Sequence, residues 1–343
     1  MTRLTTILLA AFLALTLTAC SGGAEETPVT RQIIAMDTAM SFSLYGENGD
    51  EAVQAMVEEV QRLEGILSRT DSFSEIGFLN RMPGQSVEVG EEVTALLERA
   101  RTFTETTGGA FDITIAPVVE AWGFTTDSYQ VPEAAVLTEL LGTMGMEHVH
   151  VDGATAMLDT GTQVDLGGIA KGYASDKVAE LLREKGVEKA ILTLGGNVYG
   201  IGTKPDGEKW EVALANPLDA NDYCGLISIE DQAVVTSGGY QRYFEENGKK
   251  YHHIIDPATG YPAESGLLSV TIISESGMEA DVLSTALFVM GLEDALEYWQ
   301  KNGGFEAIFI TEAGEVIATE GADACFAFEG RDNDFTYRMV EKE

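Results

Sequence analysis

The stretch Val164–Tyr173 limits the possible folds of this chain more than any other segment. It begins with apolar residues on either side of Asp165, passes through the pair Gly167-Gly168, and enters an amphipathic pattern from Ile169 to about Lys185. This order predicts the end of a strand, a tight turn and a helix. A glycine turn at the start of a helix lets a ligand approach the backbone closely and offers N–H groups to an anion.

Lys171 falls in the first turn of that predicted helix, where the helix dipole disfavours a positive charge. An anionic ligand would explain its position, and the alternative is an ordinary turn with a solvated lysine. Both interpretations stay open from these residues alone. The segment has the glycine spacing of neither a Walker loop nor a G-x-G-x-x-G dinucleotide motif.

The chain is strongly acidic, with 21 basic and 56 acidic residues among 343 and a formal net charge of -35. Such a chain repels nucleic acid, and no basic stripe offsets the repulsion. It would also repel a polyphosphate unless a metal ion or local cations intervened, so we expect any phosphate site to contain a divalent ion. Hydrophobic residues make up 45% of the chain, which is enough to build the core of one large or two ordinary domains.

The N-terminus has the order of features that is typical of a secreted lipoprotein. Arg3 precedes an apolar run from Ile7 to Leu17 that is too short to form a stable membrane span. The next residues, Leu17-Thr18-Ala19-Cys20, resemble a bacterial lipobox, in which small residues precede a cysteine that becomes lipidated.

This pattern predicts how the chain is divided. We expect a signal peptide at residues 1–19, a lipid on Cys20, a polar tether at residues 20–31 and a single domain at residues 32–343. The lipid would anchor the protein at the extracytoplasmic face of a bacterial cell membrane, on the periplasmic side or at the cell surface.

Two further cysteines, Cys224 and Cys325, are far apart in the sequence. In an oxidising compartment they would be able to pair, and the alternative is two separate buried thiols. The chain has no C-x-x-C motif and no cluster of histidine and cysteine, so the sequence does not suggest a zinc site.

The first half of the mature chain is predicted to alternate between strands and helices. We expect one strand at Gln32–Tyr45, interrupted by a small polar step at Met36-Asp37-Thr38. Asp50 is expected to cap a helix that extends to about Leu67, and a second helix is expected at about Glu91–Thr106.

The second half is predicted to be richer in strands. Asn247-Gly248 lies between two β-rich runs and is a strong hairpin signal. A second hairpin is expected from Leu226–Ile229 and Ala233–Thr236, and the final strand at Cys325–Glu329. Other strands are expected at Ala190–Leu194, Trp210–Ala215 and Leu267–Ser274, and a helix at about Glu279–Met290.

That last helix carries two candidate metal ligands. Asp281 and Thr285 are four residues apart and therefore share one helix face. A carboxylate and a hydroxyl are hard oxygen ligands that suit Mg²⁺. The alternative, which these residues alone favour, is an aspartate that caps the helix and a threonine that packs.

His253 is the best candidate for acid–base chemistry, because it is one of 4 histidines and lies at a strand end close to Asp256. A neutral imidazole can take a proton from a hydroxyl, and the alternative is a histidine that only holds the turn. His148 and His150 lie on one side of a short strand with no chemical partner in sequence, so we expect them to be structural.

Taken together, these stretches resemble the ApbE family of FAD:protein FMN transferases, which are also called flavin-trafficking lipoproteins. The similarity covers about Ile33 to Glu329 and depends on the order and number of its motifs. The motifs are Met36-Asp37-Thr38, Leu67-Ser68 with Asn80, Gly108-Gly109-Ala110-Phe111-Asp112 with Pro117 and Trp122-Gly123-Phe124, Asp165 to Tyr173 with Asp176, Leu194-Gly195-Gly196-Asn197, Thr236-Ser237-Gly238, His253 to Gly260, and Ala280-Asp281 with Ser284-Thr285.

The resemblance implies an α+β fold with mixed or antiparallel sheets flanked by helices, and an FAD cleft between lobes. It implies Mg²⁺ at Asp281, Thr285 and the backbone carbonyl of Gly168, and His253 as the base that deprotonates an acceptor threonine. The enzyme would cleave the FAD diphosphate, transfer FMN to the threonine and release AMP. The positions that match FAD contacts are Met36, Ala110, Phe111, Asp112, Asp165 and Lys171, with Thr70 as a weaker candidate.

This chain departs from the family pattern at two positions. Asp37 stands where the family usually has glycine, which adds a carboxylate near the expected flavin. Thr70 stands where some relatives have an aromatic residue that could stack on the flavin ring.

Two other functions stay open, and the first of them would use the same site. One is a Mg²⁺-dependent FAD pyrophosphatase, in which water replaces threonine and the products are FMN and AMP. The other is a flavin-binding lipoprotein without catalysis. For a transferase, the partner would be a flavoprotein with a target threonine, such as an Rnf- or Nqr-type subunit or a secreted flavin reductase.

Overall fold

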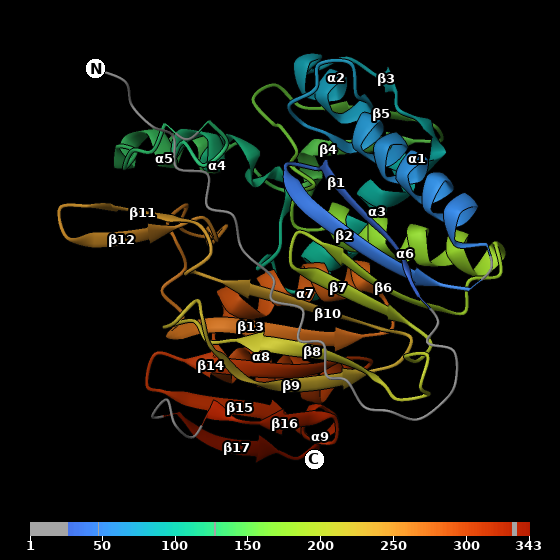
Figure 1. The fold of residues 1–343 in the computed structure, drawn as a ribbon. Coiled ribbons are helices and arrows are strands. Elements are labelled where there is room, and N and C mark those ends of the chain that lie inside the picture. Colours follow the sequence, from blue (N-terminus) through green and yellow to red (C-terminus); the bar gives the residue numbers. More distant parts are fainter. Residues whose placement is uncertain (1–26, 47, 127, 331–334) are drawn as a thin grey trace, which may run out of the picture.

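The computed structural model describes residues 27–46, 48–126, 128–330 and 335–343 (Figure 1). The predicted signal peptide and Cys20 lie outside the described residues. The first strand, β1, begins at Val29, so residues 29–31, which we assigned to the tether, belong to the fold. None of the described helices is both long enough and apolar enough to span a bilayer.

A nine-stranded mixed sheet forms the centre of the described structure (Figure 1). Neighbouring strands pair antiparallel except β15 and β17, which pair parallel. In sheet order the strands are β1 (Val29–Ala35), β2 (Thr38–Tyr45), β6 (Lys189–Leu194), β7 (Asn197–Ile201), β10 (Gln232–Gly238), β13 (Leu267–Ser274), β14 (Glu306–Thr311), β15 (Glu315–Thr319) and β17 (Thr336–Val340).

Helices pack on one face of this sheet and a small sheet packs on the other. Alternation of side chains along the strands separates the two faces. Ile272 packs with the helices, whereas the next residue, Ile273, packs with the small sheet. The helices of the first face are α1 (Gly49–Leu67), α3 (Gly90–Thr106), α6 (Ala170–Glu184), α7 (Gly277–Met290) and α8 (Leu292–Asn302), and the small sheet is β16 (Phe326–Phe328), β9 (Tyr223–Ile229) and β8 (Trp210–Ala215), with α9 (Glu320–Asp323) beside it.

Two smaller parts complete the described structure. One contains α2 (Glu75–Arg81) and the sheet β3 (Val87–Glu88), β5 (Thr155–Leu158) and β4 (Val149–Asp152), preceded by the turn η2 (Met146–His148). The other, which we call the aromatic lobe, contains η1 (Ile113–Ile115), α4 (Ala116–Ala121), α5 (Ala134–Leu141) and the hairpin β11 (Tyr243–Glu246) and β12 (Lys249–His252). Trp122, Phe124 and Ile255 are buried in the core of this lobe.

The predicted fold class is confirmed: the molecule is α+β, with mixed and antiparallel sheets flanked by helices. The hairpin at Asn247-Gly248 is also confirmed, with a two-residue turn in which both residues have positive φ. This is the backbone geometry that such turns require.

The predicted single strand at Gln32–Tyr45 is wrong. Met36 and Asp37 form a two-residue turn with φ of 49° and 57°, and β1 pairs with β2 across it. The polar step in the pattern therefore marks a reversal of the chain. Aspartate tolerates the left-handed conformation better than most residues, which explains how Asp37 occupies a position where glycine is usual.

The predicted hairpin of Leu226–Ile229 with Ala233–Thr236 is also wrong. β9 pairs with β8 and β16, whereas β10 pairs with β7 and β13. At Asp231, which has φ of 51°, the chain crosses from the small sheet to the large one. Ile229 and Val234 therefore meet in the core between two sheets instead of across one ladder.

Smaller corrections concern element ends. The residues around Asp165 form no strand. Asn48 is the cap position of α1, and Asp50 lies in the first turn of that helix. β7 and β17 were not predicted, because glycine pairs and charged residues hide their pattern.

Cys224 and Cys325 are free thiols on neighbouring segments. Cys224 lies beside Glu329, and Cys325 lies beside Ser228, so the two are offset by four residues along the ladder. Four residues of strand span roughly 13 Å, which is beyond disulfide reach. The pairing that the sequence left open is therefore excluded in this structure.

Candidate active site

The predicted glycine turn begins α6 and holds the side chain of Lys171. Asp165 stabilises the turn by accepting a hydrogen bond from the Gly167 amide at 2.8 Å. Lys171 Nζ donates to the Gly167 carbonyl at 3.0 Å and lies 3.8 Å from Oδ1 of Asp281. The lysine in the unfavourable first turn thus faces a carboxylate from another helix.

α6 and α7 cross at two facing glycines. A Cβ at Gly172 would lie 2.2 Å from the Gly277 carbonyl oxygen and 2.6 Å from Cβ of Asp281. Because neither position has a side chain, the backbones approach closely enough for the Gly172 amide to donate to Oδ2 of Asp281 at 2.9 Å. Asp281 is 5% exposed and does not cap its own helix, which excludes the capping role considered from the sequence.

The carbonyl of Gly168 lies before the helix begins. α6 starts after the N-cap residue Ile169, so the Gly172 amide is one of the N-terminal N–H groups that have no partner within the helix, and Asp281 accepts its hydrogen bond. The Gly168 carbonyl is therefore not part of the hydrogen-bond ladder of α6. Phe111 packs against Gly168, because a Cβ at Gly168 would lie 3.1 Å from the phenyl ring.

Thr285 lies one turn after Asp281 and contacts residues that the sequence did not single out as ligands. Its Oγ1 lies 3.2 Å from Oγ of Ser237 on β10, which in turn lies 2.8 Å from Oγ of Ser284. Three hydroxyl groups therefore lie together about one turn after Asp281, and the Ser284 hydroxyl donates to the Asp281 backbone carbonyl at 2.9 Å. Both serines belong to motifs quoted for the resemblance, and that was the signal that could have identified them.

These groups fit a magnesium ion better than a softer metal. Asp281, Thr285 and the Gly168 carbonyl offer oxygen atoms only, and Mg²⁺ usually combines one or two carboxylates with water and substrate phosphates. In the part of the chain that the structure describes, no three histidine, cysteine, aspartate or glutamate residues gather into a metal cluster. A cation here would therefore rely on phosphate oxygens for part of its coordination.

A cavity of about 450 Å³ lies between the aromatic lobe and the helices. Ala110 and Asp112 line one side of it, and Asp256, Val289 and Met290 line another. Asp112 accepts hydrogen bonds from the Thr114 amide and hydroxyl, and burial raises the pKa of its carboxyl.

Phe111 lies in the core, whereas the adjacent residues Ala110 and Asp112 line the cavity. Its ring is 5% exposed, lies edge-on to Phe103 with centroids 6.5 Å apart, and is not part of the cavity wall. Phe111 therefore supports the Gly168 turn from inside the core. A direct contact between its ring and a ligand stays a prediction.

His253 directly follows β12, and its ring orientation is fixed by the backbone of Arg242. Its Nδ1 lies 3.1 Å from the Arg242 carbonyl oxygen. A carbonyl can only accept, so Nδ1 carries the proton and Nε2 keeps a lone pair. Phe124 lies edge-on to the ring with centroids 6.4 Å apart.

The surroundings of His253 favour the neutral imidazole. Burial is the main cause that lowers its pKa to about 4, and the positive charges of Arg242 and Lys171 lower it further. A neutral ring with a free Nε2 is the form in which histidine accepts a proton.

Met36 lies in the turn between β1 and β2, and Thr70 lies just after the C-terminus of α1. The Met36 amide donates to Oε1 of Glu64 on α1 at 2.7 Å, while Thr70 follows α1 and is exposed. Arg69, beside Thr70, donates to Asp165 at 3.2 Å and to Glu120 at 3.0 Å. Arg69 was not predicted, because its partners are distant in sequence.

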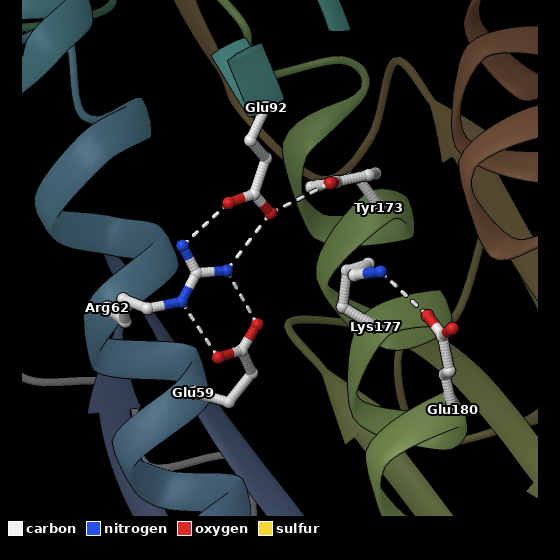
Figure 2. Close-up of polar contacts among 6 residues, drawn as sticks. All are labelled: Glu59, Arg62, Glu92, Tyr173, Lys177 and Glu180. Atoms are coloured by element: carbon white, nitrogen blue, oxygen red, sulfur yellow. Dashed lines mark hydrogen bonds and ion pairs between the residues drawn. The ribbon is translucent and has the colours of Figure 1, made fainter. Parts of the chain in front are cut away.

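A polar network fixes α6 on the side opposite α7 (Figure 2). The Tyr173 hydroxyl donates to Glu92 at 2.8 Å, and Arg62 bridges Glu92 and Glu59. The hydrogen bond from Arg62 lowers the pKa of Glu92, and burial raises that of Tyr173, so the phenol remains the donor. The helix that carries Lys171 is thus attached to α1 and α3.

His148 and His150 share one partner, contrary to the expectation that they have none. His148 Nδ1 lies 3.0 Å and His150 Nε2 lies 2.9 Å from the two oxygens of Asp159. This triad stabilises the β4–β5 sheet and its following turn, so the predicted structural role is consistent with its geometry.

Comparison with known proteins gives the same family at the levels of sequence and fold. A family model described as the ApbE family matches residues 36–309. The chain is 34% identical over 324 residues to a FAD:protein FMN transferase of Treponema pallidum, covering 88% of this chain and 90% of that protein. It is 34% identical to a FAD:protein FMN transferase of Klebsiella pneumoniae, with 83% and 89% covered.

Solved structures agree. The ApbE protein of Thermotoga maritima superposes with a TM-score of 0.81 at 35% identity, covering 87% of this chain and 99% of that one. The flavinyl transferase ApbE of Pseudomonas stutzeri gives a TM-score of 0.79 at 28% identity, with 88% and 98% covered.

The shared architecture and the ordered motifs around the α6–α7 crossing place this molecule in the structural class of the flavin transferases. More specifically, the chain belongs to the ApbE family.

Proposed function

We propose that this protein is a Mg²⁺-dependent FAD:protein FMN transferase that attaches FMN from FAD to a threonine of an acceptor flavoprotein and releases AMP. The observation that carries the proposal is the convergence of Lys171 and Asp281 at the helix crossing, within electrostatic range of a neutral His253. The names of the similar proteins support the same activity.

Asp281, Thr285 and the Gly168 carbonyl would hold the cation. When bound, Mg²⁺ would neutralise charge on the diphosphate and stabilise the charge that develops on the leaving AMP. In a protein with a net charge of -35, this neutralisation would offset the repulsion between the protein and the diphosphate.

Lys171 would contribute a second positive charge. Its bond to the Gly167 carbonyl keeps the ammonium group at the start of α6, on the side of Asp281. From there it can bind a phosphate oxygen without the glycine spacing of a Walker loop. The cavity beside Ala110 and Asp112 offers space for part of the dinucleotide.

His253 would act as the general base. Nε2 accepts the proton of the acceptor threonine hydroxyl while that oxygen forms a bond to the FMN phosphorus. The bond between this phosphorus and the bridging oxygen breaks, and AMP leaves with the electron pair. The proton then passes from His253 to AMP or to solvent, which restores the neutral imidazole.

The N-terminal sequence supports the proposed location. Lipidation of Cys20 would place the enzyme at the extracytoplasmic face of the cell membrane, and the residues that follow would act as a short tether. Acceptors would then be flavoproteins exposed at that face, such as Rnf- or Nqr-type subunits or secreted flavin reductases.

Intact mass spectrometry tests the proposal. The purified protein is incubated with FAD, Mg²⁺ and a candidate acceptor that contains a target threonine. A mass gain of one FMN unit on the acceptor, with AMP released, supports the transferase. Formation of free FMN and AMP without acceptor labelling would instead support a pyrophosphatase, and unchanged FAD would support a binding protein.

A further inference from the structure

Asp176, in the second turn of α6, binds the N-terminus of α7. Its Oδ1 accepts from the Gly277 amide at 2.5 Å, and its Oδ2 accepts from the Met278 amide at 3.0 Å and from the Ser276 hydroxyl at 2.9 Å. These amides begin α7 and have no partner within their own helix. A carboxylate at this position also interacts favourably with the positive end of the helix dipole.

α7 already has a cap of its own. Ser276 is the N-cap residue, and its hydroxyl accepts from the Glu279 amide. Asp176 therefore adds a second cap that comes from a different helix. A cap from within the helix stabilises the helix alone, whereas a cap from α6 also fixes where α7 begins relative to α6.

Each of the two helices provides a carboxylate that binds backbone amides of the other. α6 provides Asp176 to the amides of Gly277 and Met278, and α7 provides Asp281 to the amide of Gly172. In each helix the carboxylate lies about one turn after the glycine at the crossing. A shift of α7 along α6 would break both sets of bonds, so the pair of carboxylates defines one register.

We propose that Asp176 is a positioning residue for the cation site. By fixing the start of α7, it places Asp281 and Thr285 opposite the Gly168 carbonyl before any ligand binds. This inference rests on the proposed function, because it requires that these three groups hold a divalent cation. Asp176 itself would not touch the cation, the flavin or the acceptor.

The contacts around Gly277 show that the start of α7 packs closely against α6. A Cβ at Gly277 would lie 2.0 Å from the Ser175 hydroxyl and 3.0 Å from Oδ1 of Asp176. The amide can reach the carboxylate at 2.5 Å only because no side chain is present. Removal of the carboxylate would leave two amide donors at a tightly packed contact, and α7 would have to move to satisfy them.

Mn²⁺ binding tests the proposal without measuring turnover. Mn²⁺ prefers the same oxygen ligands as Mg²⁺, and the free ion is measured by electron paramagnetic resonance in the presence of FAD. Asp176→Asn keeps the size of the side chain but replaces one acceptor oxygen with an NH₂ group that faces an amide donor. We expect Mn²⁺ affinity to fall at least about tenfold, as for other residues that orient metal ligands.

Ser276→Ala is the matched control. It removes the cap that α7 supplies to itself, together with the hydroxyl bond from Ser276 to Asp176, and leaves the amides of Gly277 and Met278 bound to Asp176. We expect Ser276→Ala to lower the urea midpoint of unfolding by an amount similar to Asp176→Asn, with Mn²⁺ affinity unchanged within twofold. If both variants lose stability but only Asp176→Asn loses Mn²⁺ affinity, Asp176 positions the cation ligands and does more than stabilise α7.

The outcomes are distinct. Wild-type Mn²⁺ affinity in Asp176→Asn would overturn the positioning role and leave the proposed function intact. Equal losses of affinity in both variants would also overturn it, since the effect would then follow helix stability. Failure of the wild-type protein to bind Mn²⁺ would overturn the proposed cation site itself, and the positioning role with it.

Discussion

The Gly172 amide of α6 donates a 2.9 Å hydrogen bond to the buried carboxylate of Asp281 on α7, a residue 109 positions later in the chain. This single contact joins the glycine turn to the helix that carries the candidate metal ligands. It also satisfies an amide at the start of α6 that has no partner within its own helix. The chemistry proposed here depends on that junction.

Asp281→Asn is expected to abolish both transfer of FMN and hydrolysis of FAD. The amide side chain can still accept the bond from Gly172, so the fold should persist, but the negative charge that binds Mg²⁺ is lost. FMN labelling of an acceptor and release of AMP are measured over a range of Mg²⁺ concentrations. Asp152→Asn, at an exposed position of β4, is the control and should retain full activity.

His253→Ala is expected to retain FAD but to lose transfer by about 10²- to 10⁴-fold, the usual contribution of a general base. Flavin fluorescence measures binding, and acceptor mass measures transfer. His150→Ala, which removes a histidine that contacts Asp159, serves as control. Transfer at the wild-type rate in His253→Ala would show that another group takes the threonine proton.

The pH dependence follows from the low pKa of His253. Because burial lowers this pKa to about 4 from an ordinary value of 6.5, the ring stays neutral throughout the range from pH 5 to 7. We expect kcat/KM for transfer to fall only as the pH approaches 4, since protonation removes the base. A decline centred at pH 6.5 in the same profile would contradict this environment for the ring.

Stability, like kcat/KM, is expected to decrease as the pH falls and His253 becomes protonated. A histidine whose folded pKa is depressed stabilises the native state above pH 6.5, and this contribution is lost as the pH falls through the folded value of about 4. The free energy of unfolding in urea should therefore decrease more steeply from pH 7 to pH 5 in the wild-type protein than in His253→Asn, which has no titrating ring.

The sequence predicted the parts of the site that depend on local spacing. The glycine pair before α6 and the interval from Asp281 to Thr285 are both visible in a short window, because helix geometry brings such residues together. Asp176, Ser237 and Arg69 were missed as site residues because each acts on a partner far along the chain. Residue spacing alone contains no information about such contacts.

Errors in the strands have a related cause. Apolar residues near Ile229 and Val234 look the same whether their strands pair in one sheet or face each other across a core. The turn at Met36 and Asp37 was missed because it contains no glycine, although both residues adopt positive φ. In both cases the tertiary structure determined a backbone path that local preference did not indicate.

Gly172→Ala is expected to destabilise the protein by about 1–3 kcal/mol, as overpacking usually does. The added methyl group would lie 2.2 Å from the Gly277 carbonyl and 2.6 Å from Cβ of Asp281, and both are held by backbone that must move. α6 and α7 would therefore separate, which lengthens the bond between the Gly172 amide and Asp281. We expect weaker Mg²⁺ dependence of transfer as well as a lower free energy of unfolding in urea.

Gly65→Ala makes the same chemical change where the structure leaves room. Gly65 is exposed near the end of α1, and a Cβ there would meet no atom within 4 Å. Alanine costs less conformational entropy in a helix, so this variant should be more stable by about 0.5–1 kcal/mol with unchanged transfer. If Gly172→Ala behaved like Gly65→Ala in the urea titration, the close contact at the helix crossing would have to be wrong.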